Sequence, residues 1–492
     1  MIGIDSMDRE LIDRYIDYLP NFRKLLDTSP RLNLTSVFPP DSDTAWASIY
    51  TGLNPAKHGI VLFVDPLEKA SIQETDYLDI STIKGKTFWD IAGRHGKKVC
   101  LIFPHAAYPV WPVNGFMISP IPKIDGFQMY PPDFKFSFAC EHLEVPKRIP
   151  DSSSEYAEYL EKFKKIVKNE FDFGNHMMKH YDWDLFFFYS CALDFIQHIF
   201  WNYCDPKDPS YPGPNKFENA IRDFYVLHDI LIGEMLKNAG PDIPIIIISD
   251  HGHSMRPVNL LNINELLWRE GYLVKKGSKA VPFYKLKEKI KRSVVDLAQR
   301  TNMRKLGLQI LRRFPKVKEM YTIPSLIDFD RTIAHCSDMS GLKSYTYGGI
   351  IIQKGKLPIR EYERVQEAII NLLRTQTIPG TEEKIFEWVM EREELYSGEF
   401  ISKYPDIVFQ LKNNYGAGWA INIPLFSETA AHSFFPGTHR GDTPILFIKN
   451  LDPKKIIRYK IILEDITPTI LDILGIPEQV NIDGKSILIK SE

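Results

Sequence analysis

Six side chains of the sequence, three carboxylates and three imidazoles, could together bind metal ions: Asp5, Asp194, His198, Asp250, His251 and His439. Mixed nitrogen and oxygen ligands suit zinc, manganese or iron better than calcium, which prefers oxygen alone. Collecting several anions beside apolar segments is costly because they repel one another and lose water, and a bound cation lowers that cost. Taken alone, each Asp is explained as a helix cap or turn residue, and each His as a structural side chain.

Ser42 could supply a nucleophilic oxygen. It lies in Phe38-Pro-Pro-Asp-Ser-Asp-Thr44, where we expect a strand to end at Phe38 and a helix to begin near Thr44. The free N–H groups at a helix amino end favour an anion such as phosphate, and a nearby cation would make the serine oxygen nucleophilic at neutral pH. The alternatives are Thr44 as nucleophile, or a capping role for Ser42 or Asp43. The six ligands and this hydroxyl exceed what one tetrahedral ion binds, so we predict two divalent ions, with zinc, manganese and iron all open.

The elements that must position these residues alternate between short β-rich runs and amphipathic helical stretches, which is typical of a three-layer α/β/α sandwich with a mostly parallel central sheet. Several runs are apolar throughout, as expected of central strands covered on both faces. Ligands bind such sheets at the carboxyl ends of the strands, where the Asp and His residues lie. The predicted strands are Met1 to Ile4, Leu32 to Phe38, Lys98 to Phe103, Leu185 to Ser190, Ile243 to Ser249 and Ile445 to Ile448. The predicted helices are Asp8 to Tyr18, Thr44 to Thr51, Ser153 to Tyr181, Asn215 to Lys237 and Thr467 to Leu474.

The composition of the 492 residues is that of an ordinary globular protein. With 44% hydrophobic and 25% charged residues, the chain can bury a sizeable core and is not disordered, fibrous or collagen-like. The formal net charge of -2 creates no general attraction to nucleic acid, so we expect no nucleic acid polymer as a partner. The five cysteines lack a Cys-x-x-Cys pair and indicate reduced thiols. No signal-peptide pattern or membrane-spanning run is visible, which predicts a soluble cytoplasmic protein.

Two stretches interrupt the alternation of strands and helices. We predict a first core part at 1–255 with an insertion at about 120–181, a basic helical insertion at 256–326, and a second core part at 327–492. Residues 275–318 contain 15 Lys or Arg and 2 acidic residues, which leaves a net charge of +13. Apolar residues recur there at helical spacing, so this segment is predicted either to contact an anionic membrane peripherally or to be a solvated insertion whose apolar face packs on the core.

The sequence resembles the type I phosphodiesterase and nucleotide pyrophosphatase branch of the alkaline phosphatase superfamily. The resemblance covers most of the chain and rests on seven separated motifs in the family's order. They are Gly3-Ile-Asp5; Phe38-Pro-Pro with Thr51-Gly-Leu-Asn-Pro-Ala-Lys-His-Gly59; Asp194 and His198 with Trp201; Ser249-Asp-His-Gly252; Tyr396-Ser-Gly398 with Pro405-Asp406; Gly437-Thr-His-Arg440; and Asp465-Ile-Thr-Pro-Thr469 followed by Asp483-Gly484. An alkaline-phosphatase-like sandwich with helical insertions is implied.

The resemblance implies a phosphoric ester hydrolase with two metal ions, usually zinc. It divides the ligands into Asp194, His198 and His439 at one ion, and Asp5, Asp250, His251 and Ser42 at the other. Ser42 takes the family's nucleophile position and is therefore preferred to Thr44. The implied reaction is attack by Ser42 on a small phosphate ester, departure of an alcohol or phosphate, and hydrolysis of the phosphoseryl intermediate. Trp46 is predicted to contact the substrate, and the nearby His253 and His432 are interpreted as structural.

A phosphodiesterase is the preferred activity, with a phosphomonoesterase or phosphotransferase of the same superfamily as the alternative. Ala45 stands where secreted members place an Asn that helps to hold the phosphoryl oxygens, which argues against nucleotide diesters as the substrate. A sulfatase would need Pro and Arg where the chain has Thr44 and Trp46. A second alternative is a lipid-associated binding protein in which the basic insertion functions and the metal site is inert.

Overall fold

The structure is a computed structural model. It describes residues 1–61, 80–121, 126–135, 138, 150, 152–276, 327–337, 344–412, 414–429, 431–477, 479 and 481–489. All but the first two residues of the basic segment 275–318 lie outside the described residues, so its membrane contact stays a prediction.

A seven-stranded sheet forms the centre of the larger lobe, in the order β17-β7-β1-β6-β3-β4-β5. The five inner strands are parallel, and the two edge strands β17 and β5 are antiparallel to their neighbours. Every residue of β1, β3, β6 and β7 is buried, because helices cover both faces. The strands are β1 (Ile2–Ile4), β3 (Val99–Ile102), β4 (Gly115–Pro120), β5 (Phe127–Tyr130), β6 (Leu185–Ser190), β7 (Ile245–Ile248) and β17 (Leu446–Lys449).

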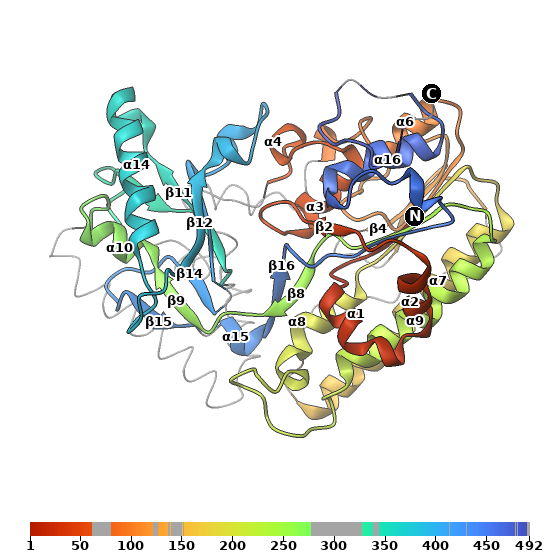
Figure 1. Cartoon of the computed structure of the whole chain (residues 1–492), viewed down its shortest axis with the longest axis horizontal. Helices are drawn as coiled ribbons and strands as arrows, with labels where there is room; N and C mark the ends of the chain where they lie inside the picture. Colours follow the sequence, from red (N-terminus) through yellow and green to blue (C-terminus); the bar gives the residue numbers. More distant parts are fainter. Residues whose placement is uncertain are drawn as a thin grey trace.

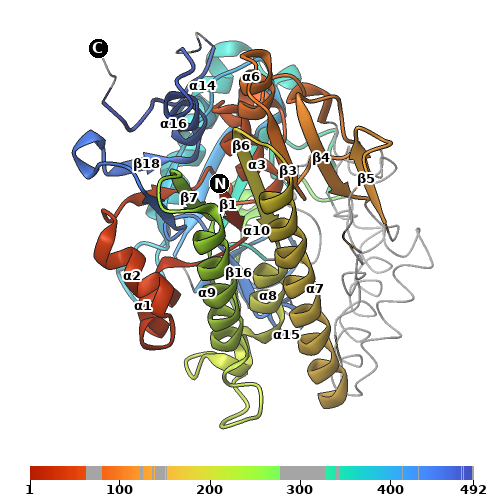
Figure 2. The same ribbon diagram turned by 90° about the vertical axis from the view of Figure 1, so that its right-hand side faces the viewer.

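Two layers of helices enclose this sheet, and alternate strand residues face each layer. Phe186 and Phe188 of β6 pack into one hydrophobic cluster, whereas Phe187 and Tyr189 pack into the other. Figure 2 shows α7, α8 and α9 side by side along one face. The predicted three-layer α/β/α class is confirmed. One layer contains α1 (Arg9–Tyr15), α2 (Pro20–Thr28), α7 (Ser153–His180), α8 (Ala192–Cys204) and α9 (Ala220–Ala239). The other contains α3 (Ser42–Thr51), α6 (Phe88–Arg94) and α16 (Ile466–Ile473).

Two of the predicted elements take other places in the fold. The segment Leu32 to Phe38 contributes only β2 (Asn33–Thr35), which pairs with β18 (Lys460–Ile462) in a separate two-stranded sheet. Only the middle residue of β2 is buried, so this strand could not lie within the doubly covered sheet. Helix α7, which we placed in an insertion, packs on the central sheet and buries Phe163 and Phe171 in its core.

A second lobe lies beside the sandwich (Figure 1) and has its own hydrophobic core. Its main sheet is antiparallel, in the order β10-β11-β13-β12, and a smaller sheet has the order β14-β9-β15. Much of the predicted second core part therefore belongs to this lobe, and β16, β17, β18 and α16 return to the sandwich. The lobe contains β9 (Asn259–Asn262), α10 (Ile263–Arg269), β10 (Ala334–Cys336), β11 (Tyr347–Ile352), α14 (Ile359–Thr375), β12 (Phe386–Glu391), β13 (Ile407–Leu411), β14 (Tyr415–Gly418) and β15 (Phe426–Glu428).

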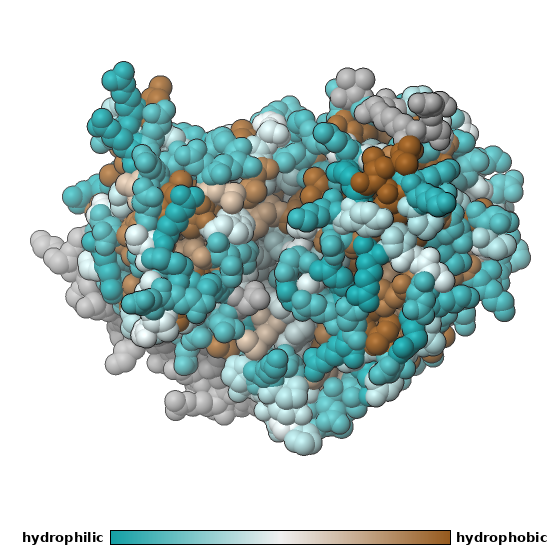
Figure 3. Space-filling model, viewed as in Figure 1, coloured by the Kyte–Doolittle hydropathy of each residue, from teal (hydrophilic) through white to brown (hydrophobic). Residues whose placement is uncertain are grey.

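The two lobes are joined where the chain leaves β8 (Gly252–Met255) and where it returns at β16 (Gly437–Arg440), and these two strands pair with each other. Arg256 is fully buried at this junction and donates to the carbonyls of Phe435, Ser344 and Gly437. In the part of the chain that the structure describes, no helix has the length and apolarity to cross a membrane. Figure 3 shows a largely hydrophilic face with smaller apolar groups, one of them over α16.

Candidate metal centre

The carboxyl ends of three adjacent strands bring the predicted ligands together. Strand β1 lies between β6 and β7 in the sheet, and its continuation Asp5 donates its backbone N–H to the Ser190 carbonyl at 3.0 Å. Asp250 and His251 follow β7, and Asp194 lies in the first turn of α8 after β6. Ends of parallel neighbouring strands meet at one edge of the sheet, so residues far apart in the sequence become neighbours.

The first cluster of possible ligands consists of Asp5, Asp250 and His251, all fully or almost fully buried. The Nε2 atom of His251 lies 3.2 Å from Asp250 Oδ2 and 3.7 Å from Asp5 Oδ1. The Ser42 hydroxyl lies 3.1 Å from the same Nε2 atom, which places the predicted nucleophile beside this cluster.

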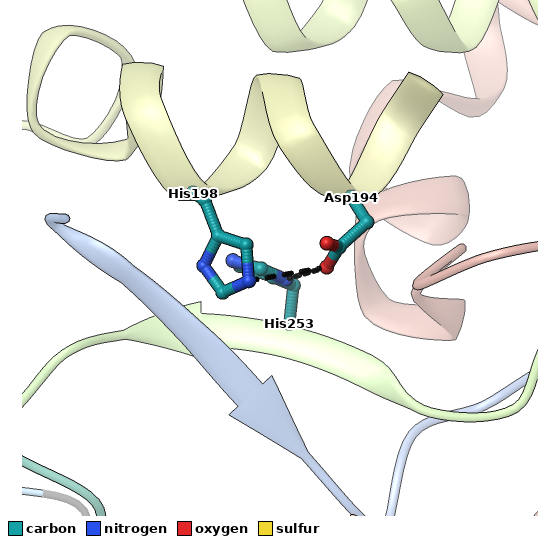
Figure 4. Close-up of side chains that lie close together, drawn as sticks. All are labelled: Asp194, His198 and His253. Atoms are coloured by element: carbon teal, nitrogen blue, oxygen red, sulfur yellow. Dashed lines mark ion pairs between the residues drawn. The ribbon is translucent and has the colours of Figure 1, made fainter. Parts of the chain in front are cut away.

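The second cluster lies on α8, β8 and β16. His198 Nε2 is 3.4 Å from Asp194 Oδ1, and His439 Nε2 is 3.5 Å from the same oxygen. Figure 4 shows Asp194 and His198 projecting from one side of α8 toward His253, whose Nδ1 is 3.7 Å from Asp194 Oδ1. The two clusters are continuous, because the rings of His251 and His439 stack with centroids 3.9 Å apart and Asp194 lies within reach of both rings.

The hydrogen bonds of the histidines leave their Nε2 atoms directed at each other. Nδ1 of His198 bonds the Gly437 carbonyl at 3.0 Å, Nδ1 of His439 bonds the Pro40 carbonyl at 2.9 Å, and Nδ1 of His251 bonds the Gly252 carbonyl at 3.1 Å. A carbonyl only accepts, so each Nδ1 must carry the proton and each neutral ring presents a lone pair at Nε2. The Nε2 atoms of His198 and His439 are only 2.9 Å apart, which requires a proton or a cation between them.

The carboxylates of both clusters complete a donor set that fits metal ions. Buried oxygens of Asp5 (Oδ1), Asp194 (Oδ1) and Asp250 (Oδ2) have no hydrogen-bond partner among the described residues, and each faces the histidine nitrogens. Backbone bonds that fix the far nitrogen of a ring, together with carboxylate oxygens left free on the near side, are the usual surroundings of a metal ion. The residues present therefore fit divalent cations.

The pKa values of the three carboxyls shift in different directions: burial and repulsion between carboxylates raise those of Asp5 and Asp250, and the neighbouring histidines lower that of Asp194. Burial raises the pKa of Asp250 to about 7, and burial together with the charges of Asp250 and Asp194 raises the pKa of Asp5 well above its usual range. Burial also opposes ionisation of Asp194, but protonation of His198 and His439, together with the hydrogen bond from His439, holds the pKa of Asp194 well below the usual range. A cation bound near Asp5 and Asp250 would supply the positive charge that their ionised forms lack.

Ser42 is the first residue of α3, and Asp41 caps that helix by accepting from the backbone N–H of Asp43. The helix thus begins two residues before the predicted start near Thr44. Thr44 itself is fully buried and donates its hydroxyl to the Ile60 carbonyl at 3.2 Å, so its oxygen is engaged away from the two clusters. The geometry therefore favours Ser42 over Thr44 as the reactive hydroxyl.

Two residues near the site have other places than the sequence suggested. The ring of Trp46 is fully buried against Tyr189 and Tyr50, which leaves it no surface open to a substrate and argues against the predicted contact. His253, which we interpreted as structural, belongs to one of the groups of possible metal ligands. Its spacing from His251 was an available signal, because alternate residues of an extended segment share a face. His432 instead bonds Asp208 and the Arg256 carbonyl.

The second lobe supports the segment before Ser42. The Tyr396 hydroxyl donates to the Phe38 carbonyl at 2.6 Å, and the Phe38 ring packs edge-on against Trp388 at 4.7 Å between centroids. Elsewhere in the motifs, Asp483 accepts from the Asn54 backbone N–H at 2.8 Å and pairs with Lys57. These contacts make the motif residues around Asn54 and Tyr396 a scaffold behind the nucleophile segment.

A family model described as type I phosphodiesterase / nucleotide pyrophosphatase matches residues 1–417. The chain belongs to this family. Membership confirms the family resemblance seen in the seven motifs and makes the protein a metal-dependent phosphoric ester hydrolase of the alkaline phosphatase superfamily. A comparison with curated protein sequences finds no significant match.

Several solved structures share the fold of this chain over most of its length. Human ectonucleotide pyrophosphatase / phosphodiesterase 5 aligns with a TM-score of 0.51 at 13% identity, covering 99% of this chain and 97% of that one. An inactive murine form of the same protein in complex with AMP aligns at 0.50 and 13%, covering 97% and 96%. Phosphonoacetate hydrolase from Sinorhizobium meliloti, in complex with phosphonoacetate, aligns at 0.51 and 13%, covering 96% and 94%.

Proposed function

We propose that the protein is a phosphodiesterase that uses Ser42 as its nucleophile and two divalent ions, preferably zinc, as cofactors. One ion is held by Asp5, Asp250, His251 and Ser42, and the other by Asp194, His198 and His439. The observation that carries the proposal is the position of the Ser42 hydroxyl at the amino end of α3, 3.1 Å from His251 Nε2. Buried oxygens of Asp5 and Asp250, which have no hydrogen-bond partner among the described residues, lie near the same nitrogen.

The chain's own groups account for binding and orientation. The positive end of the α3 helix dipole favours the negative phosphoryl oxygens, and Ser42, as the first residue of that helix, places its hydroxyl at this end. Two ions bound at these ligands would polarise the phosphoryl oxygens and stabilise charge during in-line displacement. A bond forms between Ser42 Oγ and phosphorus as the bond to the leaving oxygen breaks, and water then hydrolyses the phosphoseryl ester.

Because Asp194 lies within reach of ligands in both clusters, the two ions would be neighbours rather than independent sites. The proposed arrangement therefore favours a reaction in which attacking and leaving oxygens are both stabilised, as a diester displacement requires. A small phosphate diester is the substrate class that we propose, and a monoester is the alternative outcome of the assay below. The alternative of a lipid-binding protein with an inert site does not account for the cost of burying carboxylate oxygens that lack hydrogen-bond partners among the described residues.

The test compares Ser42→Ala with Thr44→Val, which removes the neighbouring hydroxyl that the structure engages elsewhere. Both variants and the wild type are assayed on bis(p-nitrophenyl) phosphate and on p-nitrophenyl phosphate with added zinc, manganese or magnesium. We expect Ser42→Ala to lose on the order of 10³-fold or more in kcat while Thr44→Val retains activity. A metal-loaded wild type inert on both esters, or a Ser42→Ala variant with full activity, would refute the proposal.

A further inference from the structure

A chain of hydrogen bonds leads from Asp5, in the first cluster, to the residue that follows Ser42. The Tyr189 hydroxyl donates to Asp5 Oδ2 at 2.5 Å and lies 3.1 Å from Nδ1 of His105. Nε2 of His105 lies 2.8 Å from Asp43 Oδ1. The chain therefore connects β1, β6, the loop after β3 and the first turn of α3 through the His105 ring.

The loop that carries His105 has an unusual backbone. Phe103 has a φ of 59° and Ala106 a φ of 50°, and neither residue is a glycine. Residues with a side chain rarely adopt this left-handed conformation, because it is energetically unfavourable for them. Such strain persists where surrounding contacts determine the position of the backbone, and it occurs most often at functional sites. On both sides of His105 the loop is thus held in a costly conformation that fixes the ring.

The donors and acceptors along this chain determine which ring nitrogens of His105 carry a proton. As a metal ligand Asp5 must be ionised, so its carboxylate can only accept hydrogen bonds. The single hydroxyl proton of Tyr189 is therefore donated to Asp5. The Tyr189 oxygen can then only accept from His105 Nδ1–H, and the Asp43 carboxylate can only accept from Nε2–H. Both ring nitrogens therefore donate. Burial alone would lower the pKa of His105, but the hydrogen bond and charge of Asp43 raise it above its usual value, which agrees with this assignment.

This chain of hydrogen bonds orients the Asp5 carboxylate. Tyr189 occupies Oδ2, and the other oxygen, Oδ1, is buried without a hydrogen-bond partner 3.7 Å from His251 Nε2. The Tyr189 ring cannot rotate away easily, because it packs edge-on against Trp46 with centroids 5.1 Å apart. At its other end the chain holds Asp43, so one imidazole links the orientation of a ligand carboxylate to the start of the helix that carries Ser42.

We propose that His105 is a positioning residue of the metal centre, which orients Asp5 through Tyr189 and fixes the start of α3 through Asp43. The inference rests on the proposed function, because it takes Asp5 as a ligand of the ion beside Ser42. It adds residues outside the ligand set, and its effect is expected on one of the two ions only. Among the described residues, the three hydrogen bonds of this chain are made by Asp5, Tyr189, His105 and Asp43 and by none of Asp194, His198 and His439.

The experiment titrates metal-free full-length protein with zinc in competition with a chromogenic chelator. The variants are His105→Gln, Tyr189→Phe and the double variant, with His95→Gln as the control, since His95 follows α6 directly and its Nδ1 bonds the Ile91 carbonyl of that helix. We expect His105→Gln and Tyr189→Phe each to weaken one of two bound ions by about 10-fold to 100-fold. The double variant should lose less affinity than the product of the two single losses, because both changes break the link from His105 through Tyr189 to Asp5, and the control should bind as the wild type does.

Zinc binding by His105→Gln that equals the wild type would overturn the inference and leave the proposed function intact. Additive losses in the double variant, or equal weakening of both ions, would also overturn it, because His105 would then act other than through Tyr189 on Asp5. Tyr189→Phe keeps the packed ring and guards against a variant that fails to fold. A wild-type protein that binds no zinc would refute the proposed function and the inference with it, so the two failures are distinguishable.

Discussion

Two buried aspartates in family motifs, Asp250 in the sandwich and Asp406 in the second lobe, have opposite surroundings. Asp406 accepts from the Ile352 backbone N–H at 2.7 Å and from the Tyr362 hydroxyl at 2.9 Å. It also pairs with Arg392 at 3.2 Å. Asp250 keeps an oxygen without a hydrogen-bond partner, and its pKa is raised to about 7 by burial. A buried carboxylate in a motif is therefore a candidate metal ligand where one of its oxygens has no hydrogen-bond partner among the described residues.

The largest contrast is expected in activity when each aspartate loses its charge. Asp250→Asn removes a proposed metal ligand and should lower kcat by about 10³-fold, since metal ions contribute several kcal/mol to stabilising the transition state. Asp406→Asn should leave kcat of the folded protein within a few-fold of the wild type. Assays of both variants on the diester, with metal content measured by mass spectrometry, check the comparison. Equal losses of activity would remove it.

The two regions should also differ in their response to metal removal and pH. In metal-free protein the folded pKa of Asp250, about 7, lies above its ordinary value of 3.8. The folded state therefore binds the proton more tightly, and the contribution of this group to stability is lost as the pH rises from 3.8 through about 7. Thermal unfolding of chelator-treated protein should show this fall in stability with pH, and it should be reduced in Asp250→Asn and unchanged in Asp406→Asn.

For stability we expect the opposite order: the Asp406 variant should be the more strongly affected of the two. Asp406→Asn removes one of the two carboxylates that pair with the Arg392 guanidinium, whose side chain is 8% exposed, and leaves Glu393 at 2.9 Å. Breaking a buried pair outright costs about 3 to 5 kcal/mol of unfolding free energy, so with Glu393 still in place we expect a loss of about 3 kcal/mol or less. Asp250→Asn should leave metal-free protein at least as stable as the wild type, because it removes a repelling charge. Urea unfolding of the metal-free proteins measures both, and a metal-free Asp250→Asn protein less stable than Asp406→Asn would contradict the account.

The smallest effect is expected at the scaffold pair Lys57 and Asp483. Their side chains are 40% and 27% exposed, so solvent screens the pair. Lys57→Met should change the unfolding free energy by about 1 kcal/mol or less and leave metal binding unchanged. A loss of bound metal in this variant, measured as for Asp250→Asn, would show that the scaffold and the metal centre are not separate.

The core strands, and the gathering of the proposed ligands at one edge of the sheet, could be predicted because each follows from local patterns. Apolar runs marked β6 and β7 within two residues of their ends, since strands buried on both faces admit few polar side chains. The segment containing β2 was misplaced, because its partner β18 lies more than 400 residues away and nothing local indicates that pairing. The second lobe was not predicted as a separate unit, because short apolar strands look alike in the sequence whether they belong to a parallel or to an antiparallel sheet.

Residues that act through others were the hardest to predict. His253 becomes a neighbour of Asp194 only once α8 is placed against β8. His105 depends on the left-handed backbone of Phe103 and Ala106, which no spacing of residue types indicates. Burial misled the prediction for Trp46, because the first turns of α3 face the core as well as the site. Sequence patterns thus identify ligands more readily than the side chains that orient them.

Anomalous X-ray diffraction from zinc-loaded crystals, recorded at the zinc edge, tests the central claim most directly. We expect two adjacent peaks, one among Asp5, Asp250, His251 and Ser42, and one among Asp194, His198 and His439. Zinc bound elsewhere, or no peak at these side chains in protein that is active on the diester, would contradict it.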